Sequence, residues 1–306
     1  MPESSLDAVT GAFSFTGRAI AARLLAEDRE VVTLVRRDTP NPFGDRIRIA
    51  PFALDDPERL AASLVGVDTL YNTYWIRFER GAMTFEVAIA GTLRLIDAAR
   101  RAGVRRLVHV SVVNASEAAP TPYFRAKARL EGHVRESGLS HAIVRPTLTY
   151  GPGSTVVNNL CWVLRRLPVF GVPGDGQYRL QPVHVDDVAA IAVEAGRQTD
   201  DLTTDAAGPD TLTFDDFVRL LGSAVGRRPR LVHLPPELAW GASQMLGLLV
   251  RDVMSTRTEL VELMRSLLVS RQPPRGTISL RDWVMEEGPR LGLRYHSELD
   301  RHFRPT

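Results

Sequence analysis

Short runs of β-branched and apolar residues alternate with helical patterns from residue 6 to about residue 150. This alternation limits the possible folds more than any other feature of the chain. We expect strands at 6–10, 30–35, 46–54, 68–73, 106–112 and 141–146, and helices at 17–26, 57–64, 85–102 and 123–137. Apolar strands alternating with helices predict a parallel sheet covered on both faces. The predicted fold class is therefore α/β, a doubly wound parallel sheet whose ligands bind beyond the carboxyl ends of its strands.

The pattern changes after Pro146, where turn-rich segments begin, such as 151–153 and 171–176. A helix at 186–195 is expected to return to the main sheet, and residues 208–300 read as mostly helical. We assign 1–150 and about 181–207 to a dinucleotide-binding domain. About 151–180 and 208–306 form a smaller, mostly helical substrate-binding lobe.

The stretch from 238 to 268 has Leu, Met and Val at helical spacing, together with several arginines. Such a stretch fits a helix on a membrane surface or the apolar core of a small lobe. We favour the core, in which Trp240, Met245 and Met254 would shape an apolar pocket.

Composition narrows the class of protein. The 306 residues are 44% hydrophobic and 24% charged with a net charge of +2, which favours a globular protein without a nucleic-acid partner. No apolar stretch is long enough to span a bilayer, although peripheral association stays open, and the polar start lacks a signal-peptide pattern. The sole cysteine, Cys161, reads as buried packing, and no histidine spacing suggests a metal site. We expect a cytoplasmic enzyme that acts on a small molecule.

A glycine-containing turn follows the first expected strand. Gly11 and Gly17 fit the outer glycines of a G-x-x-G-x-x-G loop, Ser14 stands at the middle position, and Phe15 in the same loop is a further candidate for binding the cofactor. Backbone amides at such a turn approach a pyrophosphate, which the helix N-terminus also attracts. The second strand leads into Arg36 and Arg37, and arginine there suits a ribose 2′-phosphate. We therefore expect NADP, with NAD as the alternative.

One lysine stands among 38 basic residues, and it follows a tyrosine by four positions in Tyr123-Phe124-Arg125-Ala126-Lys127. Positions i and i+4 share a helix face, so hydroxyl and ammonium are expected to point into the same space. A neighbouring cation favours the phenolate and lowers a tyrosine pKa, which makes the phenol usable as a general acid or base. The alternative is a core tyrosine beside a surface lysine.

These motifs together resemble the short-chain dehydrogenase/reductase superfamily, in its extended or atypical epimerase/dehydratase-like branch. The likeness covers residues 6–200 and includes the glycine loop, Tyr-x-x-x-Lys at 123–127, 144–146 leading to 150–152, and 183–189. It implies a Rossmann-type sheet. NmrA-like sensors and relatives of an accessory subunit of respiratory complex I belong to the same branch.

The resemblance also implies roles for individual residues. Tyr123 would be the general acid/base, and Lys127 would bind the nicotinamide ribose. Pro146 would lie against the nicotinamide end. Asn72, at the end of the fourth strand, would face the cofactor. Ser111 is the candidate for the serine that orients the substrate oxygen, with Ser116 and Thr121 as fallbacks.

Two functions remain open. The first is an NAD(P)-dependent oxidoreductase or epimerase, and the second is a non-catalytic NAD(P)H-binding sensor or assembly protein on the same fold. Several substitutions favour the second, among them Phe52 near the end of the third strand and the bulky Tyr74 and Trp75 after the fourth. The retained lysine favours catalysis. A homodimer is plausible from the family.

Overall fold

The computed structural model describes residues 5–36 and 40–299. The chain forms two compact units. Unit 1 comprises Met1–Pro146 and Val185–Ala206, and unit 2 comprises Thr147–His184 and Ala207–Thr306.

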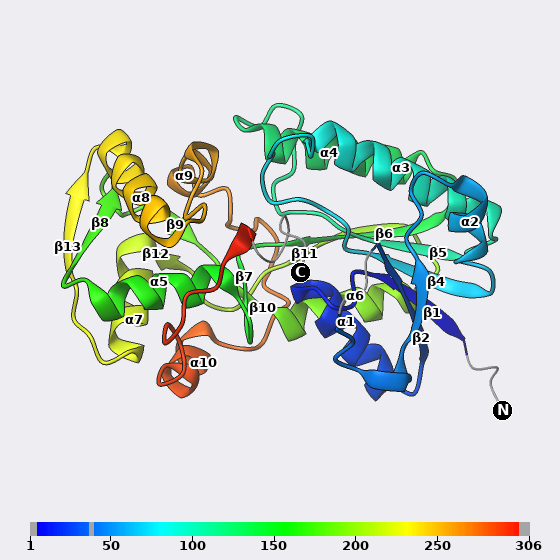
Figure 1. The fold of residues 1–306 in the computed structure, drawn as a ribbon, viewed down its shortest axis with the longest axis horizontal. Helices are drawn as coiled ribbons and strands as arrows, with labels where there is room; N and C mark the ends of the chain where they lie inside the picture. Colours follow the sequence, from blue (N-terminus) through cyan, green and yellow to red (C-terminus); the bar gives the residue numbers. More distant parts are fainter. Residues whose placement is uncertain (1–4, 37–39, 300–306) are drawn as a thin grey trace. The chain divides into compact units, whose positions relative to one another are not determined.

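Unit 1 is built on a seven-stranded sheet in which all neighbouring strands run parallel, in the order β11-β6-β5-β4-β1-β2-β3 (Figure 1). The strands are β1 (Leu6–Thr10), β2 (Glu30–Val35), β3 (Arg48–Pro51), β4 (Val67–Asn72), β5 (Arg106–Val110), β6 (Ser140–Pro146) and β11 (Leu202–Ala206). The predicted fold class is confirmed. The chain order reverses between β1 and β4, and such a switch point is where ligands bind in sheets of this kind.

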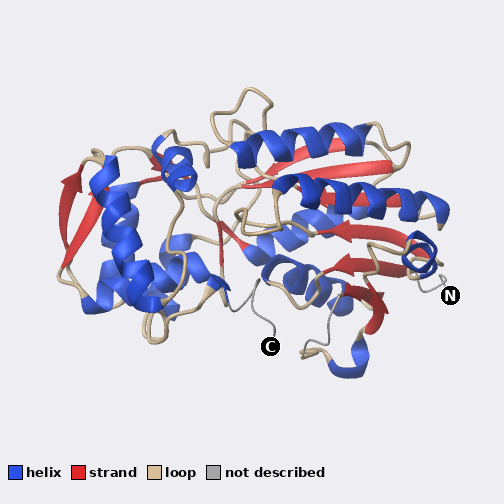
Figure 2. Ribbon diagram, turned by 45° about the horizontal axis from the view of Figure 1, so that its top comes forward, coloured by secondary structure: helices blue, strands red, loops and turns tan. Residues whose placement is uncertain are grey.

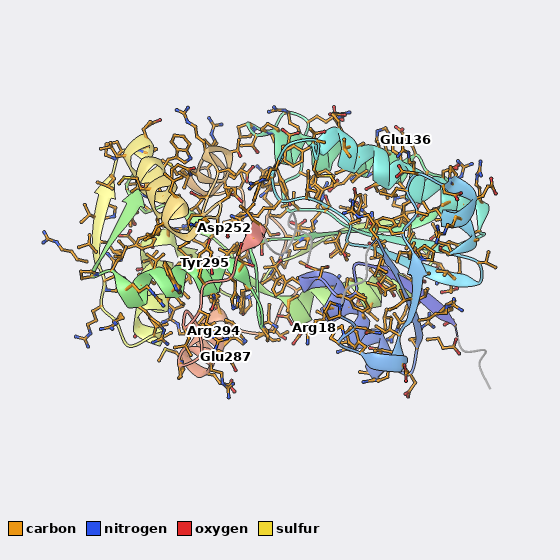
Figure 3. All side chains as sticks on the ribbon, viewed as in Figure 1. Arg18, Glu136, Asp252, Glu287, Arg294 and Tyr295 are labelled. Carbon is orange, nitrogen blue, oxygen red and sulfur yellow. The ribbon has the colours of Figure 1, made fainter. Side chains whose placement is uncertain are left out.

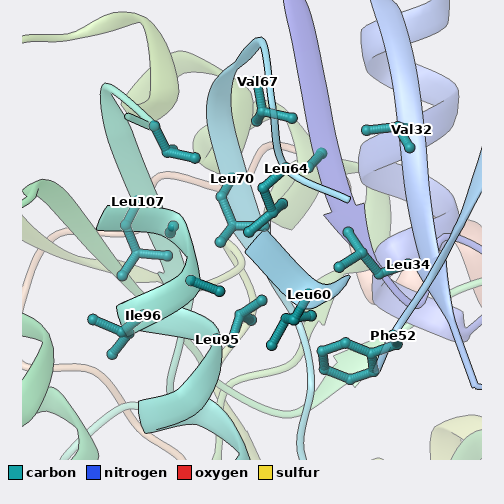
Figure 4. Close-up of a cluster of buried hydrophobic side chains, with 14 of the residues drawn as sticks. Val32, Leu34, Phe52, Leu60, Leu64, Val67, Leu70, Leu95, Ile96 and Leu107 are labelled. Atoms are coloured by element: carbon teal, nitrogen blue, oxygen red, sulfur yellow. The ribbon is translucent and has the colours of Figure 1, made fainter. Parts of the chain in front are cut away.

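Helices cover both faces of the sheet, with α1 and α6 on one face and α2, α3 and α4 on the other (Figures 1 and 2). They are α1 (Phe15–Ala26), α2 (Pro57–Ala62), α3 (Phe85–Arg101), α4 (Pro122–Arg135) and α6 (Val185–Arg197), with a short 3₁₀ turn, η1 (Gly44–Arg46). Figure 4 shows the core between the sheet and α2 and α3, where Leu60, Leu70, Leu95 and Leu107 are fully buried. Each such side chain contributes roughly 2 kcal/mol by leaving water. This core holds the carboxyl ends of β1, β4 and β5 in fixed register.

Unit 2 combines helices with short strand pairs. Its helices are α5 (Thr155–Arg166), α7 (Phe214–Ala224), α8 (Pro236–Val250), α9 (Arg257–Met264) and α10 (Leu280–Glu287). Its strands are β7 (Thr149–Tyr150), β8 (Val169–Pro173), β9 (Arg179–Leu180), β10 (Val183–His184), β12 (Leu212–Thr213) and β13 (Arg230–Leu234). Cys161 of α5 is fully buried, as predicted, and burial raises the pKa of its thiol to about 12.

Leu238, Met245, Leu248 and Leu249 of α8 do not form the core that their spacing suggested, whereas Leu246 is half-buried. Leu238, Met245, Leu248 and Leu249 are 61%, 75%, 80% and 77% exposed. The buried positions of α8 are small residues, and a Cβ added at Gly247 would lie 2.7 Å from the Asp252 carbonyl oxygen. Because the helix approaches its neighbours through small residues, its large side chains point outward. The prediction of a pocket shaped by Met245 was therefore wrong.

A buried carboxylate fixes the last described segment of unit 2. Asp252 is 8% exposed and accepts a hydrogen bond of 2.8 Å from the Tyr295 hydroxyl, and Figure 3 labels both side chains. It also accepts from the backbone N–H groups of Glu298 and Leu299, at 2.8 and 3.1 Å. Among the described helices of both units, none is long and apolar enough to cross a bilayer.

Candidate functional site

The glycine loop joins β1 to α1 at the switch point of the sheet. Gly11 adopts φ +68°, a conformation that glycine reaches without strain. Gly17 is required by close packing, because a Cβ there would lie 2.2 Å from the Gly11 carbonyl oxygen. Ser14 is the N-cap of α1, yet its hydroxyl makes no bond to the helix and donates instead to the Gly11 carbonyl, at 2.6 Å. Phe15 is the first helical residue, and the first turn of α1 holds no acidic residue.

This loop fits a dinucleotide pyrophosphate. The helix N-terminus carries partial positive charge, the first turn of α1 places no carboxylate against an anion, and the N-cap hydroxyl does not occupy the helix amides.

Arg36 follows β2, and its guanidinium lies 5.4 Å from the centroid of the Tyr74 ring. Burial raises the pKa of the Tyr74 phenol, and the Arg36 charge opposes that shift. Phe52, just after β3, meets Tyr74 edge-to-face at 5.2 Å. These three side chains form an aromatic and cationic cluster beyond β2 and β3, in which Phe52 is buried. Arg37, the other predicted phosphate ligand, lies outside the described residues.

A buried polar network joins the ends of β1, β4 and β5. The Thr10 hydroxyl accepts from the backbone N–H groups of Thr73 and Tyr74, at 2.8 and 3.1 Å, and donates to the Asn72 side-chain oxygen at 3.2 Å. The Asn72 amide nitrogen lies 3.1 Å from Nδ1 of His109. His109 is fully buried, and burial followed by the Lys127 charge lowers its pKa well below the usual value. Asn72 therefore holds the loop after β4 in place, and both ends of its amide bond within the protein.

Lys127 lies on the face of α4 that packs on the sheet. It is 2% exposed, and its ammonium donates a 3.0 Å hydrogen bond to the Val110 carbonyl at the end of β5. The same nitrogen lies 4.4 Å from the centroid of the Trp75 ring. Burial lowers the pKa of Lys127 to about 7, and the nearby Glu131 carboxylate partly opposes this shift. The ammonium is therefore poised to change its charge near neutral pH.

Tyr123 stands one helical turn before Lys127 and is half-buried. Its ring meets Trp75 and Phe85 edge-on, with centroids 6.2 and 5.9 Å away. Trp75 and Phe85 are themselves stacked, at 5.7 Å and an interplanar angle of 5°. The phenol therefore lies in an aromatic environment at the start of α4.

Ser111 follows β5, and its hydroxyl donates a 2.6 Å hydrogen bond to Glu131. Glu131 is 1% exposed and also accepts from Arg145, at 2.8 Å to Nε, and from Arg135, at 2.9 Å. One buried carboxylate thus joins α4 to β6 and to the end of β5. Ser111 contributes to this ion-pair cluster, and its role towards a substrate stays a prediction.

Pro146 ends β6, and its carbonyl accepts a 3.0 Å hydrogen bond from the Val113 N–H. The predicted residues Gly11, Asn72, Lys127 and Pro146 therefore all lie at the carboxyl edge of the sheet of unit 1. No group of three or more His, Cys, Asp or Glu side chains in the described part of the chain could hold a metal ion.

Three residues of this site escaped the sequence analysis as functional candidates: Glu131, Trp75 and His109. Glu131 carries a signal, because it continues the i, i+4 series of Tyr123 and Lys127. Trp75 and His109 contact residues that are distant in sequence, so no local pattern indicates that they belong to the site.

A parallel sheet with a glycine loop at its switch point, and a tyrosine and lysine on one helix beside it, defines the class of NAD(P)-binding oxidoreductase folds. Residues 8–205 match the model of the NAD dependent epimerase/dehydratase family, and the chain belongs to that family. The resemblance to extended short-chain dehydrogenases/reductases is thereby confirmed.

Two curated relatives illustrate the range of the family. The chain is 28% identical over 244 residues to the mitochondrial NADH dehydrogenase (ubiquinone) 1 alpha subcomplex subunit 9 of Arabidopsis thaliana. That alignment covers 76% of this chain and 60% of the relative, so the chain spans less than two thirds of that protein. It is 30% identical over 238 residues to the ceramide reductase of Caulobacter vibrioides, covering 74% of this chain and 73% of that protein.

Solved structures share the fold. The triphenylmethane reductase of a Citrobacter species, complexed with NADP(H), has a TM-score of 0.75 at 17% identity, covering 93% of this chain and 99% of that chain. The UDP-glucose 4-epimerase of Thermus thermophilus, in complex with NAD, has a TM-score of 0.65 at 21% identity, covering 92% and 99%. Reductases and epimerases of this fold thus bind either dinucleotide, and the family binds NAD(P).

Proposed function

We propose that the protein is an NAD(P)-dependent oxidoreductase or epimerase in which Tyr123 is the general acid/base and Lys127 supports it. One observation carries the proposal: α4 holds both residues one turn apart, with Lys127 buried against the end of β5 beside the switch point. Burying a lysine costs stability, so a lysine kept in such a position points to a function.

The residues take distinct roles in this proposal. Gly11, Gly17 and the N-terminus of α1 hold the pyrophosphate, and Lys127 binds the ribose hydroxyls next to the nicotinamide. A bound nicotinamide supplies or accepts a hydride. The Tyr123 phenol gives a proton to the substrate oxygen during reduction, and its phenolate takes one during oxidation. The Lys127 ammonium stabilises that phenolate through its charge.

NADP is the proposed cofactor, with NAD as the alternative. Arg36 is the described cation next to the end of β2, where a ribose 2′-phosphate is bound in folds of this kind. An Arg36→Ala variant is expected to bind NADPH more weakly and to bind NADH as before, measured by nucleotide fluorescence. Equal NADPH affinity in the variant and the wild type would remove the assignment.

The test of catalysis is NADPH oxidation over a panel of carbonyl compounds, together with epimerisation of nucleotide sugars. Tyr123→Phe removes one hydroxyl and is expected to lower turnover by roughly 10²- to 10⁴-fold. Lys127→Arg keeps a positive charge but puts a broad planar guanidinium where a compact ammonium is buried, and should lose both turnover and NADPH affinity.

A matched control is Tyr178→Phe, which removes a buried and unpaired hydroxyl from unit 2. It should leave turnover unchanged. If the wild type reacts and Tyr123→Phe reacts equally fast, Tyr123 is not the general acid/base.

One observation favours the rival function, a non-catalytic NAD(P)H-binding sensor or assembly protein. Trp75 covers the ammonium of Lys127, the group that would bind the ribose. Tight NADPH binding without turnover over the whole panel would support this rival. A cytoplasmic location and a homodimer remain predictions, and the Arabidopsis relative is named as mitochondrial.

A further inference from the structure

The helix α8 of unit 2 (Figure 1) presents apolar side chains on its outer face. The face repeats at helical spacing and is formed by Leu238, Ala242, Met245 and Leu249, with Leu248 beside them. The four large side chains of this outward stripe are each at least 61% exposed. The sequence alone left two uses open for such a helix, a lobe core and a membrane surface, and this exposure excludes the core for the stripe.

Two polar side chains of α8 bond within unit 2. The Ser243 hydroxyl lies 2.9 Å from the Ser255 hydroxyl, and the Gln244 amide donates to the Ser255 carbonyl at 3.0 Å. A surface helix in water ordinarily has the reverse arrangement, with its polar side chains outward and its apolar side chains packed on the fold. The outward stripe therefore suits an apolar medium better than water.

The exposed charges around the stripe are mostly positive. In the segment 236–268 the exposed charged residues are Glu237, Arg251, Arg257 and Arg265. Arg251 is the C-cap of α8, and the Arg257 guanidinium lies 3.3 Å from Glu237 in the first turn of α8. A cation thus stands at each end of the stripe.

The other carboxylates of this segment are buried or used by the fold. Asp252 and Glu262 are each 8% exposed, and Glu259 forms a capping box with Thr256 at the start of α9. Three exposed arginines against one exposed carboxylate leave a net charge of +2. This charge complements an anionic surface, such as that of a bilayer with acidic lipids.

A lipid surface fits the stripe better than a second copy of the chain does. Each large side chain offers on the order of 100 Å² of apolar surface, whereas each partner of a standard protein interface buries about 800 Å². Such interfaces also use aromatic or arginine anchors and hydrogen bonds, and the stripe consists of leucine, alanine and methionine alone. Acyl chains need no hydrogen-bonding partner.

The dimensions of α8 suit a helix that lies along a membrane. Its 15 residues extend for about 22 Å, which is less than the roughly 30 Å of a hydrocarbon core. A helix of this kind rests in the plane of the interface, with its apolar face among the upper parts of the acyl chains.

We infer that the outward stripe of α8 binds the surface of an anionic lipid bilayer, with Arg251 and Arg257 on lipid phosphates. The chain is then a peripheral membrane protein that is held through unit 2. The inference does not depend on the chemistry proposed for Tyr123, and it is tested without cofactor or substrate.

The first experiment is co-sedimentation of the full chain with vesicles of phosphatidylcholine and phosphatidylglycerol in equal parts. The wild type should bind, and binding should weaken on phosphatidylcholine alone and at high salt. The double variant Met245→Gln with Leu249→Gln loses two apolar contacts, so its affinity should fall by roughly 10-fold or more for each.

The matched control for the apolar contacts is Met285→Gln with Leu293→Gln. These residues are 53% and 58% exposed and lie outside α8, in the same unit. The control should bind vesicles as the wild type does. Both double variants should keep the wild-type melting temperature, because all four side chains are exposed.

The second experiment tests the cations. Arg251→Gln with Arg257→Gln should lower the affinity for the anionic vesicles by roughly 5-fold for each arginine. The control is Arg281→Gln with Arg294→Gln, two exposed arginines elsewhere in unit 2, and it should bind as the wild type does.

Three results would overturn the inference. The first is a wild type that does not sediment with the anionic vesicles. The second is an equal loss of binding in a double variant and its control, which would mean that α8 has no special part. The third comes from light scattering: a dimeric wild type and a monomeric Met245→Gln with Leu249→Gln would show that the stripe covers a second copy. Tyr123→Phe should bind vesicles as the wild type does, so a failure of the proposed function leaves this inference standing.

Discussion

Replacing Lys127 by methionine should change how the stability of unit 1 depends on pH. Burial sets the lysine pKa at about 7 in the folded chain, against an ordinary value of 10.5 in the unfolded chain. Between these values the unfolded chain binds a proton that the folded chain does not. Stability must therefore rise with pH through this window and be lowest below about pH 7.

The size of the effect follows from the two pKa values. Between about pH 7 and pH 9.5 the wild type should gain about 3 kcal/mol of unfolding free energy from this one group. Lys127 is 2% exposed, so solvent screening does not dilute the shift. Lys127→Met keeps a similar length without a charge, and its stability should lack this gain.

The measurement is urea unfolding at both pH values, followed by the ¹⁹F resonance of 5-fluorotryptophan at position 75. Trp75 belongs to unit 1 and the other three tryptophans belong to unit 2, so this resonance reports unit 1 alone. Lys127→Arg is the control, because arginine stays protonated and should show no gain in this window. If wild type and Lys127→Met change in parallel between the two pH values, the ammonium is not desolvated and the reasoning is wrong.

Three further substitutions test the packing of the site. Glu131→Gln leaves the partly buried Arg145 beside a neutral partner, and urea unfolding should show a loss of about 2 kcal/mol; no loss would mean that the cluster is solvated. Gly17→Ala forces a Cβ against the Gly11 carbonyl, so both the melting temperature and NADPH binding should fall, and an unchanged protein would contradict the close approach. Gly132→Ala meets no atom within 4 Å on the helix α4, and should raise stability by up to about 1 kcal/mol in the same assay.

Local patterns predicted the elements of unit 1 well where the runs of residues are strongly β-branched. Both β1 and β2 have the predicted bounds, because β1 ends just before Gly11 and the valine-rich run of β2 ends just before the charged Arg36. The third strand is shorter than the predicted 46–54, since η1 takes its start and a turn follows Pro51. The strand β11 was missed, because its sequence LTTDA offers few apolar residues, although it pairs along its whole length with β6.

In the candidate site, the sequence predicted only which residues lie close together on the same helix. Tyr123 and Lys127 are neighbours on a helix, so their spacing was visible. Trp75 and Lys127 are in contact although they lie 52 residues apart in the sequence. No local sequence pattern predicts this contact. The donation by Ser111 to Glu131 likewise depends on how α4 lies on the sheet. Side-chain partners of this kind are set by tertiary packing.

The burial of Lys127 beneath an indole has a practical consequence for chemical labelling. Acylating reagents meet a single side-chain amine in this chain, and it is shielded in the folded state. With much of that amine unprotonated near neutrality, its acylation rate is limited by exposure rather than by charge. An arginine-specific protease releases the peptide that carries Lys127, and mass spectrometry then measures how much of it is acylated. The rate of acylation therefore reports how often the Lys127 amine becomes exposed, in the unmodified sequence and at any chosen temperature.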